Sequence, residues 1–203
     1  MSGHAAPEEL REIETREAEL DPATSPVADL LELGLLYLEP AHREEDAIRL
    51  FESILARDPD HGPARLWLAY SLLHYAMDQP SLARAQDLLT PLLDAGTYGG
   101  AAHMLLAEVR DEQGADVGER IRLLEASVAQ EPDWVSNRHD LAWAYSAAGR
   151  HDAAAEQLEQ ALEAIRAEDP SWTAAERSYD QSITGRTEFG AEERLRADLR
   201  QLT

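Results

Sequence analysis

The sequence lacks two residue types on which many enzymes and metal sites depend. None of its 203 residues is cysteine, which excludes disulfides, thiolate zinc sites, iron–sulfur clusters and thiol nucleophiles. All 18 basic residues are arginine. The absence of lysine excludes a Schiff-base lysine, a Walker-type phosphate lysine and a Ser–Lys nucleophile pair.

Positively charged residues are also scarce. The chain carries 18 arginines against 40 aspartates and glutamates, which gives a formal net charge of −22. Nucleic acids and anionic membranes would be repelled by such a surface, so neither is expected as a partner. The charge instead favours a basic protein partner, or it serves only to keep the chain in solution.

Long hydrophobic runs are missing as well. The densest apolar stretch, from Leu30 to Leu38, is interrupted by Glu32 and Gly34 and is far too short to span a bilayer. The N-terminus carries acidic residues where a signal peptide would carry positive charge followed by an apolar run. We therefore expect a cytoplasmic protein.

Motifs for catalysis and for metal binding are absent from the sequence. The seven histidines show neither the His-x3-His nor the His-Glu-x2-His spacing of a helical zinc site. The chain contains no Gly-x-Ser-x-Gly elbow and no glycine-rich phosphate loop. The sequence therefore predicts a protein without catalytic residues, metal or cofactor.

The chain contains an internal repeat. A segment that begins near Pro59 recurs 73 residues later, near Pro132. The residues matched at this offset are Pro59 with Pro132, Arg65 with Arg138, Leu68 with Leu141, and Ala69 with Ala142. An offset of 73 residues corresponds to two units of about 34 residues plus a few inserted loop residues. A further copy is therefore expected between these two, and another before the first.

The best-formed copy runs from Val135 to about Ile165. Apolar and small residues recur there at helical spacing on both sides of Gly149. The residues that define the pattern are Leu141, Ala142, Tyr145, Gly149, Ala154, Leu158 and Ala161. This set resembles the tetratricopeptide repeat, in which leucine and a small residue precede an aromatic, another small residue and a large apolar residue. The resemblance implies an all-α, right-handed α-solenoid of stacked helix–turn–helix hairpins.

Three further copies share parts of this pattern. The first contains Leu33, Gly34, Tyr37, Ala47 and Phe51, the second Leu68, Ala69, Leu72, Ala85 and Leu89, and the third Leu106, Ala107, Gly114 and Leu124. The second has a longer loop and contains Pro91, which should kink its second helix or end it early. The third departs from the pattern at Arg110 and Arg120. Four copies in series predict about four repeats.

These copies divide the chain into three predicted parts. Residues 1–26 form an acidic N-terminal segment with a short helix, residues 27–168 form four repeats, and residues 169–203 form capping helices. The predicted repeats cover residues 27–61, 62–98, 99–133 and 134–168. A helix is expected at about 171–181. A last helix, with Leu195, Leu199 and Leu202 on one face, should cover the apolar end of the stack.

The resemblance also implies where a partner would bind. Stacked hairpins line a concave face with their first helices, and such arrays bind partners there. The residues that the spacing directs to this face are Leu31, Leu35, Leu66, Trp67, Tyr70, His74, Met104, Glu108, Asp111, Glu112, His139, Asp140 and Trp143. The predicted groove is apolar and aromatic in its first half and acidic in its second. Trp67, Tyr70 and Trp143 would anchor apolar side chains, and the acidic residues would meet arginine or lysine.

Other arrangements of the groove residues stay open. Trp67 and Trp143 could instead pack between neighbouring repeats, or the N-terminal helix could fill the groove. The cluster of Glu108, Asp111 and Glu112 could be a solvated helix face. For the aromatic residues we favour groove binding over packing between repeats, whereas both interpretations of the acidic cluster stay open.

The favoured function is a non-enzymatic protein–protein interaction module with a basic protein or peptide partner, and a monomer is the expected state. An alternative is a dedicated inhibitor, such as an immunity protein or antitoxin, of one basic enzyme. The charge distribution would then direct contact to the N-terminal part. Residues 1–60 carry sixteen acids and five arginines, a net −11, whereas residues 171–203 carry six acids and five arginines, a net −1. A third possibility is a scaffold component that self-assembles through Leu195, Leu199 and Leu202.

Overall fold

A computed structural model describes residues 7–39, 41–94, 96, 98–132, 134–166 and 191–202 of the chain. All the regular structure within these ranges is helical, which confirms the all-α prediction. The helix expected at about 171–181 lies outside the described residues. None of the described helices is long and apolar enough to cross a membrane.

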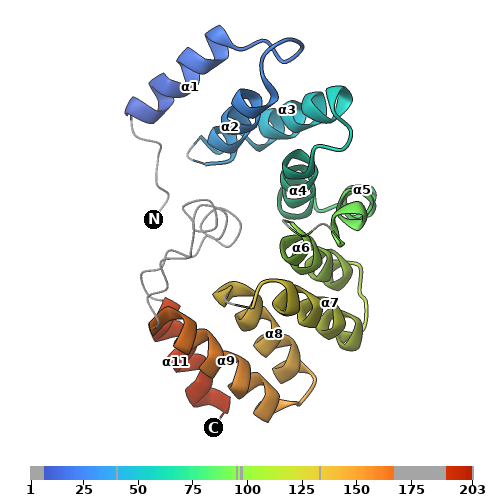
Figure 1. Cartoon of the computed structure of the whole chain (residues 1–203), viewed down its shortest axis with the longest axis vertical. Helices are drawn as coiled ribbons and strands as arrows, with labels where there is room; N and C mark the ends of the chain where they lie inside the picture. Colours follow the sequence, from blue (N-terminus) through green and yellow to red (C-terminus); the bar gives the residue numbers. More distant parts are fainter. Residues whose placement is uncertain are drawn as a thin grey trace. The chain divides into compact units, whose positions relative to one another are not determined.

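Consecutive helices pair into four hairpins (Figure 1). The hairpins are α2 (Val27–Leu38) with α3 (Glu44–Arg57), α4 (Gly62–Ser71) with α5 (Gln79–Leu89), α6 (Gly99–Glu112) with α7 (Val117–Gln130), and α8 (Val135–Ala147) with α9 (His151–Arg166). A π-helical turn, η1 (Leu72–Ala76), extends α4, and a 3-10 turn, η2 (Thr90–Leu92), follows α5. Helix α1 (Pro7–Glu19) packs against α2, and α11 (Ala191–Leu202) packs against α9. This order of helix pairs is the tetratricopeptide-like fold that the repeats predict.

The helices form two compact units, Met1–Leu92 and Leu93–Thr203. Within the first unit α3 packs against α4, and within the second α7 packs against α8. Each unit therefore stacks two hairpins through the second helix of one and the first helix of the next. The residues expected on the concave face divide between the units, with Leu31 to His74 in the first and Met104 to Trp143 in the second.

The first and second helices of each hairpin carry a small and a large buried residue at corresponding positions of the repeat pattern. The small residues are Gly34, Ala69, Ala107 and Ala142, and the large ones at the corresponding positions are Phe51, Leu89, Leu124 and Leu158, all of them buried. A Cβ atom added to Gly34 would lie 2.4 Å from Cε1 of Phe51. The first hairpin therefore pairs the smallest residue with the largest, and the other three pair alanine with leucine.

The internal repeat at an offset of 73 residues corresponds to a repeated contact. Nε of Arg65 donates to the carbonyl oxygen of Pro59 at 2.7 Å, and Nε of Arg138 donates to that of Pro132 at 2.6 Å. In both places the arginine belongs to a first helix, and the proline belongs to the loop that precedes it. The matched sequence positions therefore fix the connection between hairpins in the same way in both units.

Each of the four hairpin turns contains one residue in the left-handed backbone region. In the two turns of the second unit these residues are Gly114, with φ of 80°, and Gly149, with φ of 73°. In the two turns of the first unit they are His42 and Met77, each with φ of 52°. Glycine adopts this conformation without a steric penalty, whereas other residues adopt it at a cost in free energy. The two turns of the first unit are therefore strained, and those of the second are not.

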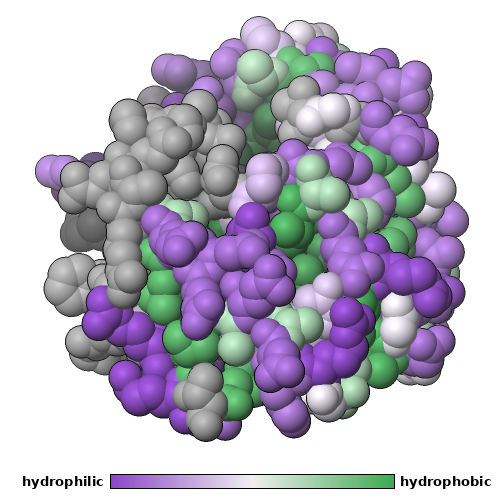
Figure 2. Space-filling view, turned by 60° about the horizontal axis from the view of Figure 1, so that its bottom comes forward, coloured by the Kyte–Doolittle hydropathy of each residue, from purple (hydrophilic) through white to green (hydrophobic). Residues whose placement is uncertain are grey.

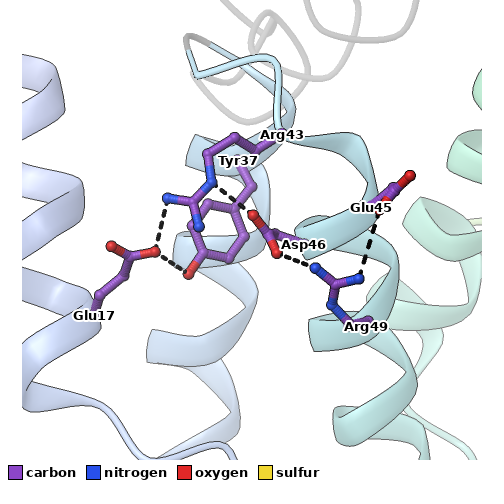
Figure 3. Close-up of polar contacts among 6 residues, drawn as sticks. All are labelled: Glu17, Tyr37, Arg43, Glu45, Asp46 and Arg49. Carbon is purple, nitrogen blue, oxygen red and sulfur yellow. Dashed lines mark hydrogen bonds and ion pairs between the residues drawn. The ribbon is translucent and has the colours of Figure 1, made fainter.

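Helix α1 is attached to the first hairpin by a polar contact that Figure 3 shows. The hydroxyl of Tyr37 donates to Oε1 of Glu17 at 2.8 Å, and Nη1 of Arg43 lies 2.7 Å from the same oxygen. The Arg43 guanidinium also stacks over the Tyr37 ring, 4.5 Å from its centroid. Buried Ile13 adds an apolar contact, and Nη1 of Arg16 pairs with Glu32 at 2.8 Å.

The same arrangement recurs between α7 and the last hairpin. There the hydroxyl of Tyr145 donates to Oε1 of Glu125 at 2.7 Å, and Arg150 lies over the ring, 4.2 Å from its centroid. In both places the glutamate precedes the tyrosine by 20 residues. Helix α1 therefore occupies, next to α2, the place that the second helix of a preceding hairpin would take.

The pairing of Gly34 with Phe51 predicts a size exchange between the two helices. Gly34→Ala should lower the free energy of unfolding by about 1–3 kcal/mol, because the added methyl group overpacks the site. This loss should exceed the gain of about 1 kcal/mol expected when alanine replaces glycine within a helix. Phe51→Leu alone should also destabilise the chain, because it leaves a cavity.

The double variant Gly34→Ala/Phe51→Leu reproduces the alanine–leucine pair of the other hairpins. In urea unfolding, the double variant should lose less free energy of unfolding than the two single variants lose together. Strictly additive losses would contradict the proposed contact.

The Tyr37 contact predicts a loss of stability at high pH. Burial, followed by the hydrogen bond to Glu17, raises the pKa of Tyr37 to about 12, whereas an unfolded tyrosine ionises near pH ~10. Stability linked to this proton is therefore fully present below pH ~10 and is lost as the pH rises towards 12. Tyr37→Phe should weaken this fall when the free energy of unfolding is measured against pH. An unchanged slope would contradict the burial of the phenol.

Candidate functional site

In the first unit, the predicted groove residues are more buried than an open face would leave them. Leu66 is buried, Trp67 and Tyr70 are each only 7% exposed, and Leu31, Leu35 and His74 are half-buried. The Trp67 and Tyr70 rings meet edge to face with centroids 5.6 Å apart, and the His74 ring lies 4.4 Å from Tyr70. These aromatic residues form one row of edge-to-face and tilted ring contacts along α4 and η1. Burial also lowers the pKa of His74, so its imidazole is neutral at neutral pH.

The exposed end of this row was not predicted from the sequence. Tyr75 is 41% exposed and Met77 is 57% exposed, and the Tyr75 ring lies 6.2 Å from that of Tyr70. Both residues lie at the end of the π-helical turn, whose wider hydrogen bonding links the Met77 amide to the Leu72 carbonyl at 3.1 Å. The repeat pattern contains no signal for this extra residue, so the sequence assigned no role to Tyr75 or Met77.

In the second unit, helix α6 carries the acidic part of the predicted face. Met104 is buried, Glu108 is half-buried, and Asp111 and Glu112 are exposed. Oδ2 of Asp111 pairs with Nη1 of Arg120 from α7 at 3.0 Å. Arg120, which departs from the repeat pattern, therefore neutralises part of this acidic face within its own hairpin.

Helix α8 brings three predicted residues together with one residue of α11. His139 is 5% exposed, Asp140 is half-buried, and Trp143 is 53% exposed. Nε1 of Trp143 donates to Nε2 of His139 at 3.0 Å. Oδ2 of Asp198 also lies 3.0 Å from Nε2, so this nitrogen accepts from the indole in one tautomer and donates to the carboxylate in the other. Oδ1 of Asp140 lies 4.0 Å from Nδ1. The cluster places the indole N–H of Trp143 against the imidazole and leaves much of the ring at the surface.

The cluster offers recognition chemistry rather than a metal centre. Among the residues that the structure describes, no group of three or more histidine, aspartate or glutamate side chains is placed to hold a metal ion. The exposed indole offers an apolar surface and a cation–π face, and Asp140 offers a carboxylate beside it. The sequence did not predict a role for Asp198, because it lies 59 residues from His139 and no sequence pattern relates the two positions.

The apolar surface is interrupted on the face that Figure 2 presents. Apolar patches are separated there by hydrophilic side chains. A ligand for such a surface would need both apolar and charged groups. The arrangement around Trp143, with carboxylates near an exposed aromatic ring, has this mixed character.

Comparisons with known proteins identify the fold. The structure is similar to a crystal structure of MamA (TM-score 0.61, 23% identity), covering 77% of this chain and 88% of that one. It is also similar to MamA from Desulfovibrio magneticus RS-1 (TM-score 0.58, 20% identity, 79% and 85% covered). A thermophilic TPR protein of Thermus thermophilus matches with a TM-score of 0.57 and 18% identity over 87% of this chain and 98% of that one. No family model matches the sequence, and no curated protein matches it. The shared feature is the tetratricopeptide-like fold.

The His139 cluster predicts that α11 protects the imidazole. Leu195 is buried, so Leu195→Asp should detach α11 and remove Asp198 from His139. Modification by diethylpyrocarbonate, followed by mass spectrometry, should then increase several-fold at His139 and stay constant at exposed His151. If His139 stays protected in the variant, α11 is not what shields it.

Proposed function

We propose that this chain is a non-enzymatic protein–protein interaction module that holds a basic partner segment against the first helices of its second unit. The observation that carries the proposal is the exposed ring of Trp143, which is held by His139 and flanked by Asp140. The tetratricopeptide-like fold supports the choice, because arrays of this kind present their first helices to partners.

Trp143 has the properties of a binding anchor. Tryptophan is among the residues that contribute most to binding when a partner buries them, and over half of this side chain is available to be buried. Its N–H group lies 3.0 Å from Nε2 of His139, so the tautomer protonated at Nδ1 provides an acceptor for this group when the ring is buried. By contrast, Trp67 and Tyr70 have little exposed surface left to lose, so we assign the anchor to Trp143.

The acidic residues supply the charge preference for the partner. Asp140 belongs to the cluster on α8, and Glu108 and Glu112 lie on α6, the first helix of the adjacent hairpin. Asp111 lies on the same helix, and Arg120 already pairs with it. A net charge of −22 adds long-range attraction for a basic segment. We infer that the partner places an apolar side chain on Trp143 and arginine or lysine near these carboxylates.

A photo-crosslinking amino acid placed at position 143 tests the proposal. In lysate of the source cells, it should crosslink a small number of basic proteins, and increasing salt should reduce the yield because the attraction is electrostatic. The matched control carries the same amino acid at Val117, an exposed apolar residue at the start of α7. Equal crosslinking at both positions would contradict a specific face.

The identity of the crosslinked protein would separate the remaining roles. A basic enzyme that loses activity when the chain binds would identify a dedicated inhibitor. A second copy of this chain would identify a self-assembling scaffold. A non-enzymatic partner whose binding is abolished by Trp143→Ala would identify an adaptor.

A further inference from the structure

One nitrogen of His139 has two partners that require opposite states of protonation. Nε2 of His139 lies 3.0 Å from Nε1 of Trp143 and 3.0 Å from Oδ2 of Asp198. The indole N–H only donates and needs a bare nitrogen, whereas an ionised carboxylate only accepts and needs an N–H group. A ring nitrogen carries either one lone pair or one hydrogen, so Nε2 bonds to one of these two partners at a time.

Two carboxylates draw the proton of the imidazole towards opposite nitrogens. Oδ1 of Asp140 lies 4.0 Å from Nδ1 and favours a proton there, whereas Asp198 favours a proton on Nε2. Asp198 is the nearer of the two, and at 3.0 Å its oxygen is within hydrogen-bond distance of the ring. We therefore expect the Nε2–H tautomer in the free chain, with the imidazole bonded to α11.

The solvent exposure of Trp143 determines which tautomer is favoured. The Trp143 side chain is 53% exposed, so in the free chain water can accept from the indole N–H in place of His139. A partner that covers the ring excludes this water, and a buried N–H group without an acceptor is unfavourable. Burial of the indole therefore favours a proton on Nδ1, which makes the lone pair of Nε2 available to Trp143.

The same change of tautomer releases Asp198. When the proton is on Nδ1, the carboxylate of Asp198 faces the lone pair of Nε2 and loses its hydrogen bond to the ring. The Asp198 side chain keeps 19% of its surface exposed, so a group at the surface can reach it. A half-buried carboxylate that loses one partner is stabilised by a cation that replaces it.

We propose that Asp198 is a recognition residue, which bonds to His139 in the free chain and to an arginine or lysine of the partner in the complex. Trp143 takes over Nε2 of His139 when the partner covers the indole, and α11 then presents the carboxylate of Asp198 to the basic side chain. This inference rests on the proposed function, because the exchange requires a partner that buries Trp143. It adds α11 to the helices that contact the partner.

NMR of the free full-length chain tests the competition at Nε2 without a partner. The chain contains four tryptophans, so its indole N–H groups give few signals, and the signal lost in Trp143→Phe is that of Trp143. Asp198→Ala should move this signal downfield, because His139 then accepts from the indole. Nitrogen NMR of labelled histidines in mildly alkaline buffer, where imidazoles are neutral, should show His139 change from the Nε2–H to the Nδ1–H tautomer.

Two further variants separate the exchange from other effects of the substitution. Glu159→Ala removes an exposed carboxylate from α9 and should leave the Trp143 signal unchanged. Leu195→Asp detaches α11 and should move this signal in the same direction as Asp198→Ala, so the result does not depend on how α11 tolerates the alanine. If neither variant of α11 moves the indole signal, the exchange is overturned.

A peptide probe tests the contact between Asp198 and a basic partner. The probe is the synthetic peptide Arg-Arg-Leu-Leu-Arg-Arg, and each control peptide carries citrulline, which has a similar shape and no charge, in place of one arginine. At one position the replacement should weaken binding about tenfold for the wild-type chain and only about twofold for Asp198→Ala, because the variant lacks the carboxylate. Equal losses for both chains at every position would overturn the contact.

Addition of the probe to the wild-type chain separates the exchange from the proposed function. The bound probe should shift the Trp143 signal and bring His139 into the Nδ1–H tautomer. A shift of Trp143 without a change of tautomer would overturn the exchange and leave the proposed face intact. If the probe leaves Trp143 unaffected and crosslinking is equal at positions 143 and 117, the proposed function fails, and the contact between Asp198 and a partner fails with it.

Discussion

The close approach of the two helices in each hairpin is the constraint on which the rest of the structure depends. Protein interiors are packed too densely to accept an added methyl group without adjustment. Gly34 therefore accompanies Phe51, and the alanines of the other hairpins accompany leucines. Because the exchange in size takes place within one pair, the hairpins can stack by similar contacts although their sequences differ. The loop contacts of Arg65 and Arg138 then attach the second hairpin to the first and the fourth to the third.

The same constraint explains how much of the fold and the site could be predicted. A small residue and a large residue recur at a similar separation along the sequence in all four copies. The helices and their pairing could therefore be predicted from the sequence. The exposure of the face could not be predicted, because the spacing of Trp67 and Tyr70 in the sequence is the same whether or not a neighbouring element covers them. The π-helical turn also escapes prediction, since one inserted residue leaves the apolar pattern around Leu72 intact. Trp143 was predicted at an exposed face, whereas the contact of His139 with Asp198 of α11 was not predicted.

The N-terminal helix shows how an array of hairpins can end. By position, Ile13 of α1 corresponds to Ile121 of α7, and both are buried, while Arg16 stands where α7 has buried Leu124. The side of α1 that a preceding first helix would cover therefore carries charge, and Arg16 uses it to pair with Glu32. A polar outer face is what the end of a solenoid requires, because an apolar one would invite further stacking. The spacing of Glu17 to Tyr37, repeated in Glu125 to Tyr145, was the sequence signal for this arrangement.

The two units differ in the residues that occupy the left-handed positions of their turns. In the second unit, Gly114 and Gly149 allow the chain to reverse without strain, and the candidate anchor Trp143 lies within a helix. In the first unit the aromatic residues of the helix are buried, and exposed side chains stand in the strained turns at His42 and Met77. A side chain at a position that favours glycine reduces stability. The first unit therefore folds against a strain in its turns that the second unit avoids by placing glycine there.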